Sequence, residues 1–136
     1  MKKKLVKLIR NQNSKEEGLH IPIPVEEYVD KICNYSTIIP YIVNGEIVAF
    51  ISYYNNDEHK LDAYMTMILV SKNTQGMGIG KLLLDASIAD LKKSGFNTYS
   101  LEVLKENNRA IELYKKYGFK VSEEKVESFL MKKKLL

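Results

Sequence analysis

A glycine-rich turn at residues 75–80, Gln-Gly-Met-Gly-Ile-Gly, is the feature of this 136-residue sequence that most constrains its fold. Before the turn, the segment from Leu61 to Val70 is apolar on both faces and rich in β-branched and aromatic residues, which predicts a central strand. After the turn, apolar residues recur at helical spacing from Ile79 to Ala89, which predicts a helix. The turn therefore joins the end of a strand to the start of a helix.

This turn is predicted to bind an anion. Its glycines let the backbone approach a ligand closely, and the first N–H groups of the helix have no partner inside it. With the partial positive charge of the helix N-terminus, the segment becomes a cradle for a pyrophosphate. The turn does not match the dinucleotide-binding fingerprint, because Lys81 stands at the last glycine position of that pattern. It does not match the P-loop either, because Leu82 stands where that motif has a Ser or Thr to hold magnesium.

Turn signals and periodicity predict the remaining elements. Asn44-Gly45 lies between two apolar segments and predicts a tight hairpin, since Asn-Gly accepts positive φ angles. Pro24 precedes a helical pattern with acidic residues in its early turns. The predicted order is a strand at Leu5 to Ile9, a loop at 11–20, a helix at 25–35, antiparallel strands at 41–43, 47–54 and 61–70, a helix from Ile79, a strand at 98–103, a helix at 107–117, and a last pair of strands from Val121 and at 128–135.

This order predicts an α/β (α+β) fold with a mixed sheet and one parallel crossover, between the strands at 61–70 and 98–103. The length predicts a single domain over residues 1–136. Hydrophobic residues at 45% and charged residues at 28% exclude disordered and fibrous classes.

Charge and cysteine content indicate the cellular compartment and the classes of partner to expect. The net charge of +4 comes largely from Lys2-Lys3-Lys4 and Lys132-Lys133-Lys134, which are interpreted as solvated flanks of terminal strands, with no nucleic-acid motif beside them. Cys33 is the sole cysteine, which excludes an intramolecular disulfide and favours a reducing, cytoplasmic compartment. Apolar runs fall far short of the ~20 residues of a membrane span, so no membrane partner is expected.

Two groups of residues together resemble the GNAT superfamily of N-acetyltransferases. Val70, the turn at 75–80 and Leu83 look like the acetyl-CoA motif of that superfamily. Leu101-Glu102-Val103, Asn107, Ala110 and the run from Leu113 to Phe119 resemble its following strand and helix. The resemblance implies a mixed, mostly antiparallel twisted sheet of six to seven strands with three to four helices.

The resemblance also implies roles for individual residues. Backbone N–H groups of the turn would hold the pyrophosphate of coenzyme A, Leu69 and Val70 would offer backbone groups to the pantetheine arm, Asn107 would contact the cofactor, and Tyr114 would be the general acid for the departing thiolate. Asn107 is equally a good helix N-cap, and Tyr114 equally suits a helix core. The predicted cofactor-binding residues are Leu69, Val70, Gln75, Gly76, Met77, Gly78, Ile79, Gly80, Lys81 and Asn107, with Tyr114 catalytic and no metal.

The implied reaction is direct attack of a primary amine on acetyl-CoA in a ternary complex. The general base stays open, because 64–70 contains no carboxylate and the nearest acids are Asp62, Asp57, Glu58 and Glu46, with a water wire as the alternative. The lack of a clear candidate for the general base favours an acceptor amine of low pKa, such as an amino sugar or an α-amine.

The acceptor is expected to contact the helix at 25–35, the hairpin and the turn from Tyr53 to His59. A catalytically silent coenzyme A sensor or interaction module on the same fold is the alternative function. A nucleic-acid binder that uses the two lysine runs is the weaker one. A homodimer is the default assembly for a small soluble enzyme.

Overall fold

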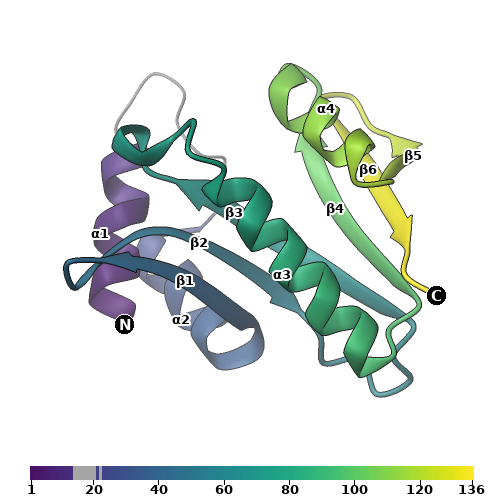
Figure 1. Ribbon diagram of the computed structural model, residues 1–136, viewed down its shortest axis with the longest axis horizontal. Helices are drawn as coiled ribbons and strands as arrows, with labels where there is room; N and C mark the ends of the chain where they lie inside the picture. The colour runs from purple at the N-terminus through teal and green to yellow at the C-terminus, as the bar shows by residue number, and fades with distance from the viewer. Residues whose placement is uncertain (14–20, 22) are drawn as a thin grey trace. The chain divides into compact units, whose positions relative to one another are not determined.

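A mixed six-stranded sheet and four α-helices form the computed structural model, which describes residues 1–13, 21 and 23–136 (Figure 1). The strand order is β1-β2-β3-β4-β6-β5, with β3 and β4 parallel. This confirms the predicted fold class and the predicted parallel crossover. The elements are α1 (Lys2–Asn13), α2 (Val25–Tyr35), β1 (Thr37–Val43), β2 (Glu46–Tyr54), β3 (Asp62–Val70), the 3₁₀ turn η1 (Lys72–Thr74), α3 (Ile79–Ser94), β4 (Thr98–Leu104), α4 (Asn108–Lys116), β5 (Lys120–Glu124) and β6 (Ser128–Lys134).

Backbone contacts divide the chain into two compact units. The first unit comprises Met1–Tyr53 and Met67–Ser87, and the second comprises Tyr54–Thr66 and Ile88–Leu136. The expectation of a single domain remains a prediction.

The hairpin of the first unit forms where the sequence predicts it. β1 and β2 are antiparallel, and their register closes on the pair Val43 and Glu46. Between them Asn44 and Gly45 adopt φ angles of 51° and 79°, which are the two positive values that a type I′ turn requires. Pro40 lies in β1, which is the outer strand of the sheet order, so its missing N–H costs no ladder bond to a second neighbour.

The predicted strand at Leu5 to Ile9 is wrong, because this segment lies within the helix α1. Leu5, Leu8 and Ile9 follow the i, i+3, i+4 spacing of one helix face, and all three are buried. They belong to the same buried cluster as Val29 and Ile32 of α2. The predicted loop at 11–20 begins inside α1 and otherwise lies outside the described residues.

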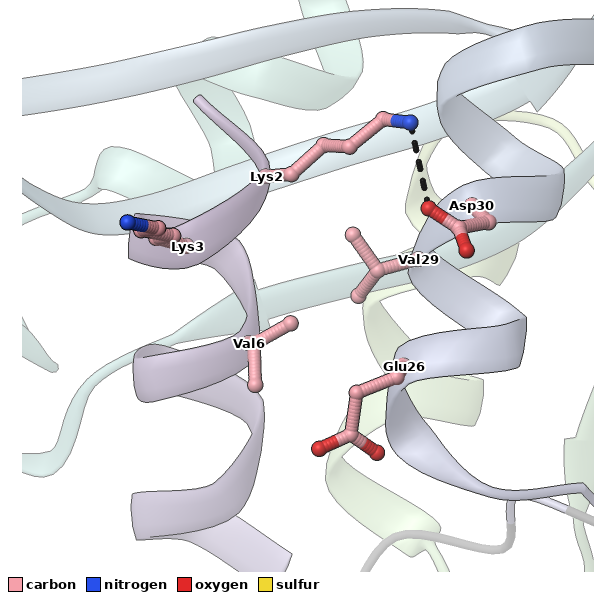
Figure 2. Close-up of a pocket in the computed structure, with 6 residues that line it drawn as sticks. All are labelled: Lys2, Lys3, Val6, Glu26, Val29 and Asp30. Atoms are coloured by element: carbon pink, nitrogen blue, oxygen red, sulfur yellow. Dashed lines mark ion pairs between the residues drawn. The ribbon is translucent and has the colours of Figure 1, made fainter.

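Ion pairs join α1 to its neighbours within the first unit. Lys2 pairs with Asp30 at 3.1 Å, and Figure 2 shows these side chains pointing toward one another across a shallow groove between α1 and α2. Val6 and Val29 form the apolar part of this groove. The first lysine run is therefore part of a helix and not the flank of a strand.

The second unit packs α4 and the segment that follows it against one face of β4. Tyr99, Leu101 and Val103 alternate along β4, so they share a face, and all are buried. The Tyr99 ring lies 5.6 Å from the Phe119 ring, and the Tyr114 ring lies 5.8 Å from it in an edge-on arrangement. β4 pairs with β6, and β6 pairs with β5 at the edge.

No helix among the described residues has both the length and the apolar character of a membrane span.

Candidate functional site

Several hydrogen bonds fix the connection from β3 to α3 in the first unit. The backbone N–H of Ser71 donates to the Val48 carbonyl at 2.9 Å, which anchors the end of β3 to the neighbouring strand β2. Ser71 and Thr74 then share a hydroxyl–hydroxyl bond of 2.8 Å, and the Thr74 N–H donates to the Ser71 carbonyl at 3.0 Å. The glycine turn therefore starts from a fixed backbone position.

The Gln75 side chain is hydrogen-bonded to the strand that precedes the glycine turn. Its Nε2 donates to the Val70 carbonyl oxygen at 3.1 Å, across five residues of chain. A glutamine at this position therefore ties the last residue of β3 to the start of the glycine turn. This structural role was not predicted from the sequence, because the pattern gave a residue type at 75 but no partner for its side chain.

Two of the three glycines in the turn are required by backbone conformation. Gly76 and Gly78 have φ angles of 85° and 78°, a region that side chains of L-residues rarely adopt. A Cβ at either position would meet no atom within 4 Å, so the backbone angle and not the space around it demands glycine. Gly80 has no positive φ, and a Cβ there would lie 3.7 Å from the Val70 Cγ2. Neither the backbone angle nor the space around it therefore requires glycine at position 80.

The N-terminus of α3 presents unpaired backbone donors. The Leu82 N–H donates to the Gly78 carbonyl at 3.0 Å as the first bond of the helix, so the N–H groups of Ile79, Gly80 and Lys81 have no acceptor inside the helix. No acidic residue occupies the first turn of α3, so its partial positive charge is not neutralised there. The arrangement can bind an anion such as a phosphate.

Asn107 acts as the N-cap of α4 in the second unit. Its Oδ1 accepts from the Ala110 N–H at 3.2 Å, and its backbone carbonyl accepts from the Ile111 N–H at 3.1 Å. The N-cap alternative is therefore confirmed. A contact between Asn107 and a cofactor stays a prediction.

The Tyr114 ring is buried on α4, with 6% of the residue exposed. Burial raises the pKa of Tyr114 to about 12, so the phenol holds its proton at neutral pH. Tyr114 thus combines a rigid ring with an available proton donor.

The carboxylates considered as general bases are mostly engaged in local structure. Asp57 accepts backbone N–H bonds from His59 and Leu61 at 3.1 Å and from Asp62 at 3.2 Å, and these bonds, with that of Asp62 strongest, lower its pKa. Asp62 also accepts from the Thr98 hydroxyl, and Glu46 pairs with Lys7 at 3.6 Å. The turn before β3 is therefore built on Asp57, and its carboxylate is a weak base.

The predicted site residues fall into the two units. Leu69, Val70 and residues 75–81 come together in the first unit, at the junction of β3 with α3. Asn107 and Tyr114 belong to the second unit, at the start and within α4. Within the described residues, no group of three or more His, Cys, Asp or Glu side chains gathers in a way that could hold a metal ion.

Comparison with known proteins identifies one family over most of the chain. Residues 6–119 match the family model described as Acetyltransferase (GNAT) family. An uncharacterized N-acetyltransferase of Methanocaldococcus jannaschii is 36% identical over 85 residues, which cover 60% of this chain and 38% of that protein. A probable spermine N(1)-acetyltransferase of Bacillus subtilis subsp. natto is 29% identical over 102 residues, 69% of this chain and 66% of that protein. The chain thus spans less than two thirds of the length of these curated relatives.

Solved structures share the fold at low sequence identity. The Ard1 structure from Thermoplasma volcanium has a TM-score of 0.81 at 23% identity, covering 100% of this chain and 94% of the other. The PaiA N-acetyltransferase of Thermoplasma acidophilum, solved in complex with coenzyme A, has a TM-score of 0.79 at 20% identity, covering 98% and 92%. These likenesses show that the described residues share the fold of these structures.

Proposed function

Because this chain belongs to the GNAT acetyltransferase family, a family of acyltransferase enzymes, we propose that it transfers the acetyl group of acetyl-CoA to a primary amine of a small molecule. The observation that carries this proposal is the junction of β3 with α3, where Gly76 and Gly78 hold positive φ angles directly before the free N–H groups of the helix. That combination suits a pyrophosphate, which coenzyme A contains.

In this proposal the coenzyme A pyrophosphate binds the N–H groups of residues 76–81, and Lys81 adds a cation beside them. Gln75 keeps the turn in its binding shape through its bond to the Val70 carbonyl. Leu69 and Val70 offer backbone groups to the pantetheine arm, and Asn107 contacts the cofactor from its N-cap position. A fold neighbour, the PaiA N-acetyltransferase of Thermoplasma acidophilum, was solved with coenzyme A, which supports this cofactor.

The proposed reaction is one direct transfer. The neutral amine nitrogen attacks the thioester carbonyl carbon, the C–S bond breaks, the sulfur leaves with the electron pair, and the nitrogen releases a proton to solvent. Tyr114 donates a hydrogen bond to the departing sulfur. Because a thiol has a pKa of ~8.5 while that of Tyr114 is about 12, the phenol stabilises the thiolate as a donor and is the weaker acid of the two.

The acceptor is proposed as a primary amine of a small molecule. Two relatives are named for different amines: one is the probable spermine N(1)-acetyltransferase of Bacillus subtilis subsp. natto, and the other is the ribosomal protein bS18-alanine N-acetyltransferase of Haemophilus influenzae. The Asp57 carboxylate accepts backbone hydrogen bonds and is a weak base. We therefore keep the hypothesis that the acceptor amine has a low pKa, as in an amino sugar or an α-amine. We also propose a cytoplasmic location, on the basis of the single Cys33, and a homodimer as the default assembly.

The test measures release of the coenzyme A thiol from acetyl-CoA with a panel of amines. We expect amine-dependent thiol release that rises with pH as the acceptor amine loses its proton, since Tyr114 stays protonated throughout. Tyr114→Phe should lower kcat by roughly 10²-fold or more with little change in coenzyme A affinity. Tyr117→Phe, at the C-cap of the same helix, is the matched control and should change kcat little.

Coenzyme A binding without thiol release for any amine would instead identify a catalytically silent sensor. An unchanged kcat in Tyr114→Phe would remove this residue from the chemistry.

A further inference from the structure

The second lysine run, Lys132-Lys133-Lys134, is divided between the two faces of the sheet in the second unit. Side chains alternate along β6, and Met131 is fully buried, so Lys133 shares the core face with it. The Lys133 ammonium lies beside the end of α4, where a Cβ added to Gly118 would lie 3.0 Å from its Nζ. Lys132 and Lys134 lie on the opposite, open face, and both are exposed. The run is therefore not one continuous charged surface.

A further lysine, from β5, joins Lys132 on the open face. Lys120 is the direct partner of Lys132 in the antiparallel register of β5 and β6, and it is also exposed. Side chains at directly opposite positions share a face, and their Cβ atoms lie about 4.5–5.5 Å apart. Like charges at such positions destabilise a sheet. The pair of Lys120 and Lys132 therefore costs stability unless an anion lies between the two ammonium groups.

Nearby carboxylates of this unit are paired with other lysines. Two ion pairs, both at 2.7 Å, are Lys105 with Glu124 and Lys125 with Glu102. Neither pair includes Lys120 or Lys132. On its other side Lys132 stands opposite Ser100 of β4, which carries no charge. The two residues directly opposite Lys132 are thus a lysine and a serine, and an external anion can occupy the position beside the two lysines.

A phosphate dianion is the species best suited to two adjacent ammonium groups. The lysine ammonium is a compact charge on a flexible four-carbon stem, so both groups can turn toward one ligand. A phosphate monoester carries close to two negative charges above its second pKa of about 6, and it offers three acceptor oxygens. A phosphate diester and a carboxylate each carry a single charge. The lysine pair therefore favours free phosphate or a phosphate monoester over a diester.

We propose that Lys120 and Lys132, on the open face of β5 and β6, form a binding site for a dianionic phosphate. The ligand is inorganic phosphate or the phosphate monoester of a small molecule, and its oxygens accept hydrogen bonds from both ammonium groups. Both residues belong to the second unit, whereas the glycine turn belongs to the first. The inference goes beyond the proposed function and does not depend on it.

Lys134 provides a matched control on the same strand and the same face. Its partner on β4 is Thr98, and the register of β5 with β6 begins at Lys132, so Lys134 has no lysine opposite it in the register. If the open face is only a solvated charged surface, substitution of any of the three lysines weakens phosphate binding to the same small extent. A site at the pair predicts a large effect at Lys120 and Lys132 and a small one at Lys134.

The experiment is an NMR titration of the full chain at constant ionic strength and about pH 8, where a phosphate monoester is doubly charged. Inorganic phosphate, methyl phosphate and dimethyl phosphate are added separately, and the Kd is read from the amide signals of residues 120–121 and 131–133. We expect saturable shifts with both dianions and much weaker binding of dimethyl phosphate. The dianion that binds more tightly identifies the source as free phosphate or a monoester.

Lysine variants then test the pair itself. Lys120→Gln and Lys132→Gln should each raise the Kd by roughly 3- to 10-fold, because each removes one charge-assisted hydrogen bond at an exposed position. Lys134→Gln should change the Kd by less than about twofold. Lys120→Glu places an opposite charge beside Lys132, so we expect loss of phosphate binding with a Tm at or above that of the wild type at low salt. This variant separates loss of the site from loss of folding.

Equal effects of the three glutamine variants would overturn the inference. Equally tight binding of dimethyl phosphate, retained binding in Lys120→Glu, or no shift of these signals in the wild type would do the same. Phosphate at the glycine turn is followed separately through the amide signals of residues 76–81. A result there bears on the proposed coenzyme A site alone.

Discussion

At the scale of single residues, the three glycines of the turn differ in their backbone conformation. Gly78 has a φ of 78°, so alanine there must adopt a left-handed conformation. We expect Gly78→Ala to lower the free energy of unfolding by about 1–2 kcal/mol. Gly80→Ala should be neutral or stabilising by about 0.5–1 kcal/mol, because Gly80 lies in α3 without a positive φ and its new Cβ would lie at ordinary contact distance from Val70.

Urea unfolding of the two variants measures this difference. Since both substitutions add the same methyl group to the same turn, each is the control for the other. A larger loss of stability in Gly80→Ala than in Gly78→Ala would contradict the assignment of backbone strain to Gly78.

Side-chain partners at the residue scale were beyond prediction from the sequence. The bond of Gln75 to the Val70 carbonyl and the pair of Glu102 with Lys125 join residues that no local pattern relates. The N-cap role of Asn107 was foreseen as an alternative, because a capping interaction involves only residues three positions apart. The capping contact was therefore predictable, and the partners of Gln75 and Glu102 were not.

At the scale of elements, α1 shows how a short apolar pattern misleads. In a strand, Leu5 and Ile9 share a face and Val6 and Leu8 share the other, whereas in a helix Leu5, Leu8 and Ile9 lie together. We expect Leu8→Ala to cost about 2–5 kcal/mol of unfolding free energy, as for other buried leucines. Val6→Ala should cost clearly less, because Val6 lies at the groove between α1 and α2 and is only partly buried (Figure 2).

Thermal or urea unfolding of Leu8→Ala and Val6→Ala checks this order. Equal losses in the two variants, or a larger loss in Val6→Ala, would contradict the burial pattern of the helix.

The remaining elements were predicted where a signal was strong. Asn44-Gly45 predicted the hairpin correctly because few dipeptides accept two positive φ angles. The helix α3 has sixteen residues, which is long enough for its helical periodicity to be recognised in the sequence. The segment from Leu5 to Ile9 spans little more than one helical turn, so its apolar residues fitted both the helical and the strand periodicity. Its contacts with Val29 and Ile32, which decide the matter, are tertiary.

At the scale of the whole molecule, some of the basic side chains are paired with carboxylates in each unit. Lys7 and Arg10 of α1 both pair with carboxylates of the first unit, and Lys105 and Lys125 do so in the second. The net charge of +4 nevertheless attracts polyanions without selectivity. A test of cofactor binding must therefore separate recognition of coenzyme A from attraction of any phosphate.

Thermal unfolding with separate additions of acetyl-CoA, NAD and ATP makes this separation for the whole chain. A ligand at about 100 times its Kd stabilises the native state by roughly 2.7 kcal/mol, which for a chain of this size raises the Tm by roughly 5–15 °C. We expect such a shift with acetyl-CoA and a much smaller one with NAD or ATP, because residues 75–81 match neither the dinucleotide fingerprint nor the P-loop. Gly78→Ala should reduce the acetyl-CoA shift, and Gly80→Ala should retain it. Equal shifts with all three compounds in both variants would point to unselective attraction of phosphate and against a coenzyme A site in the glycine turn.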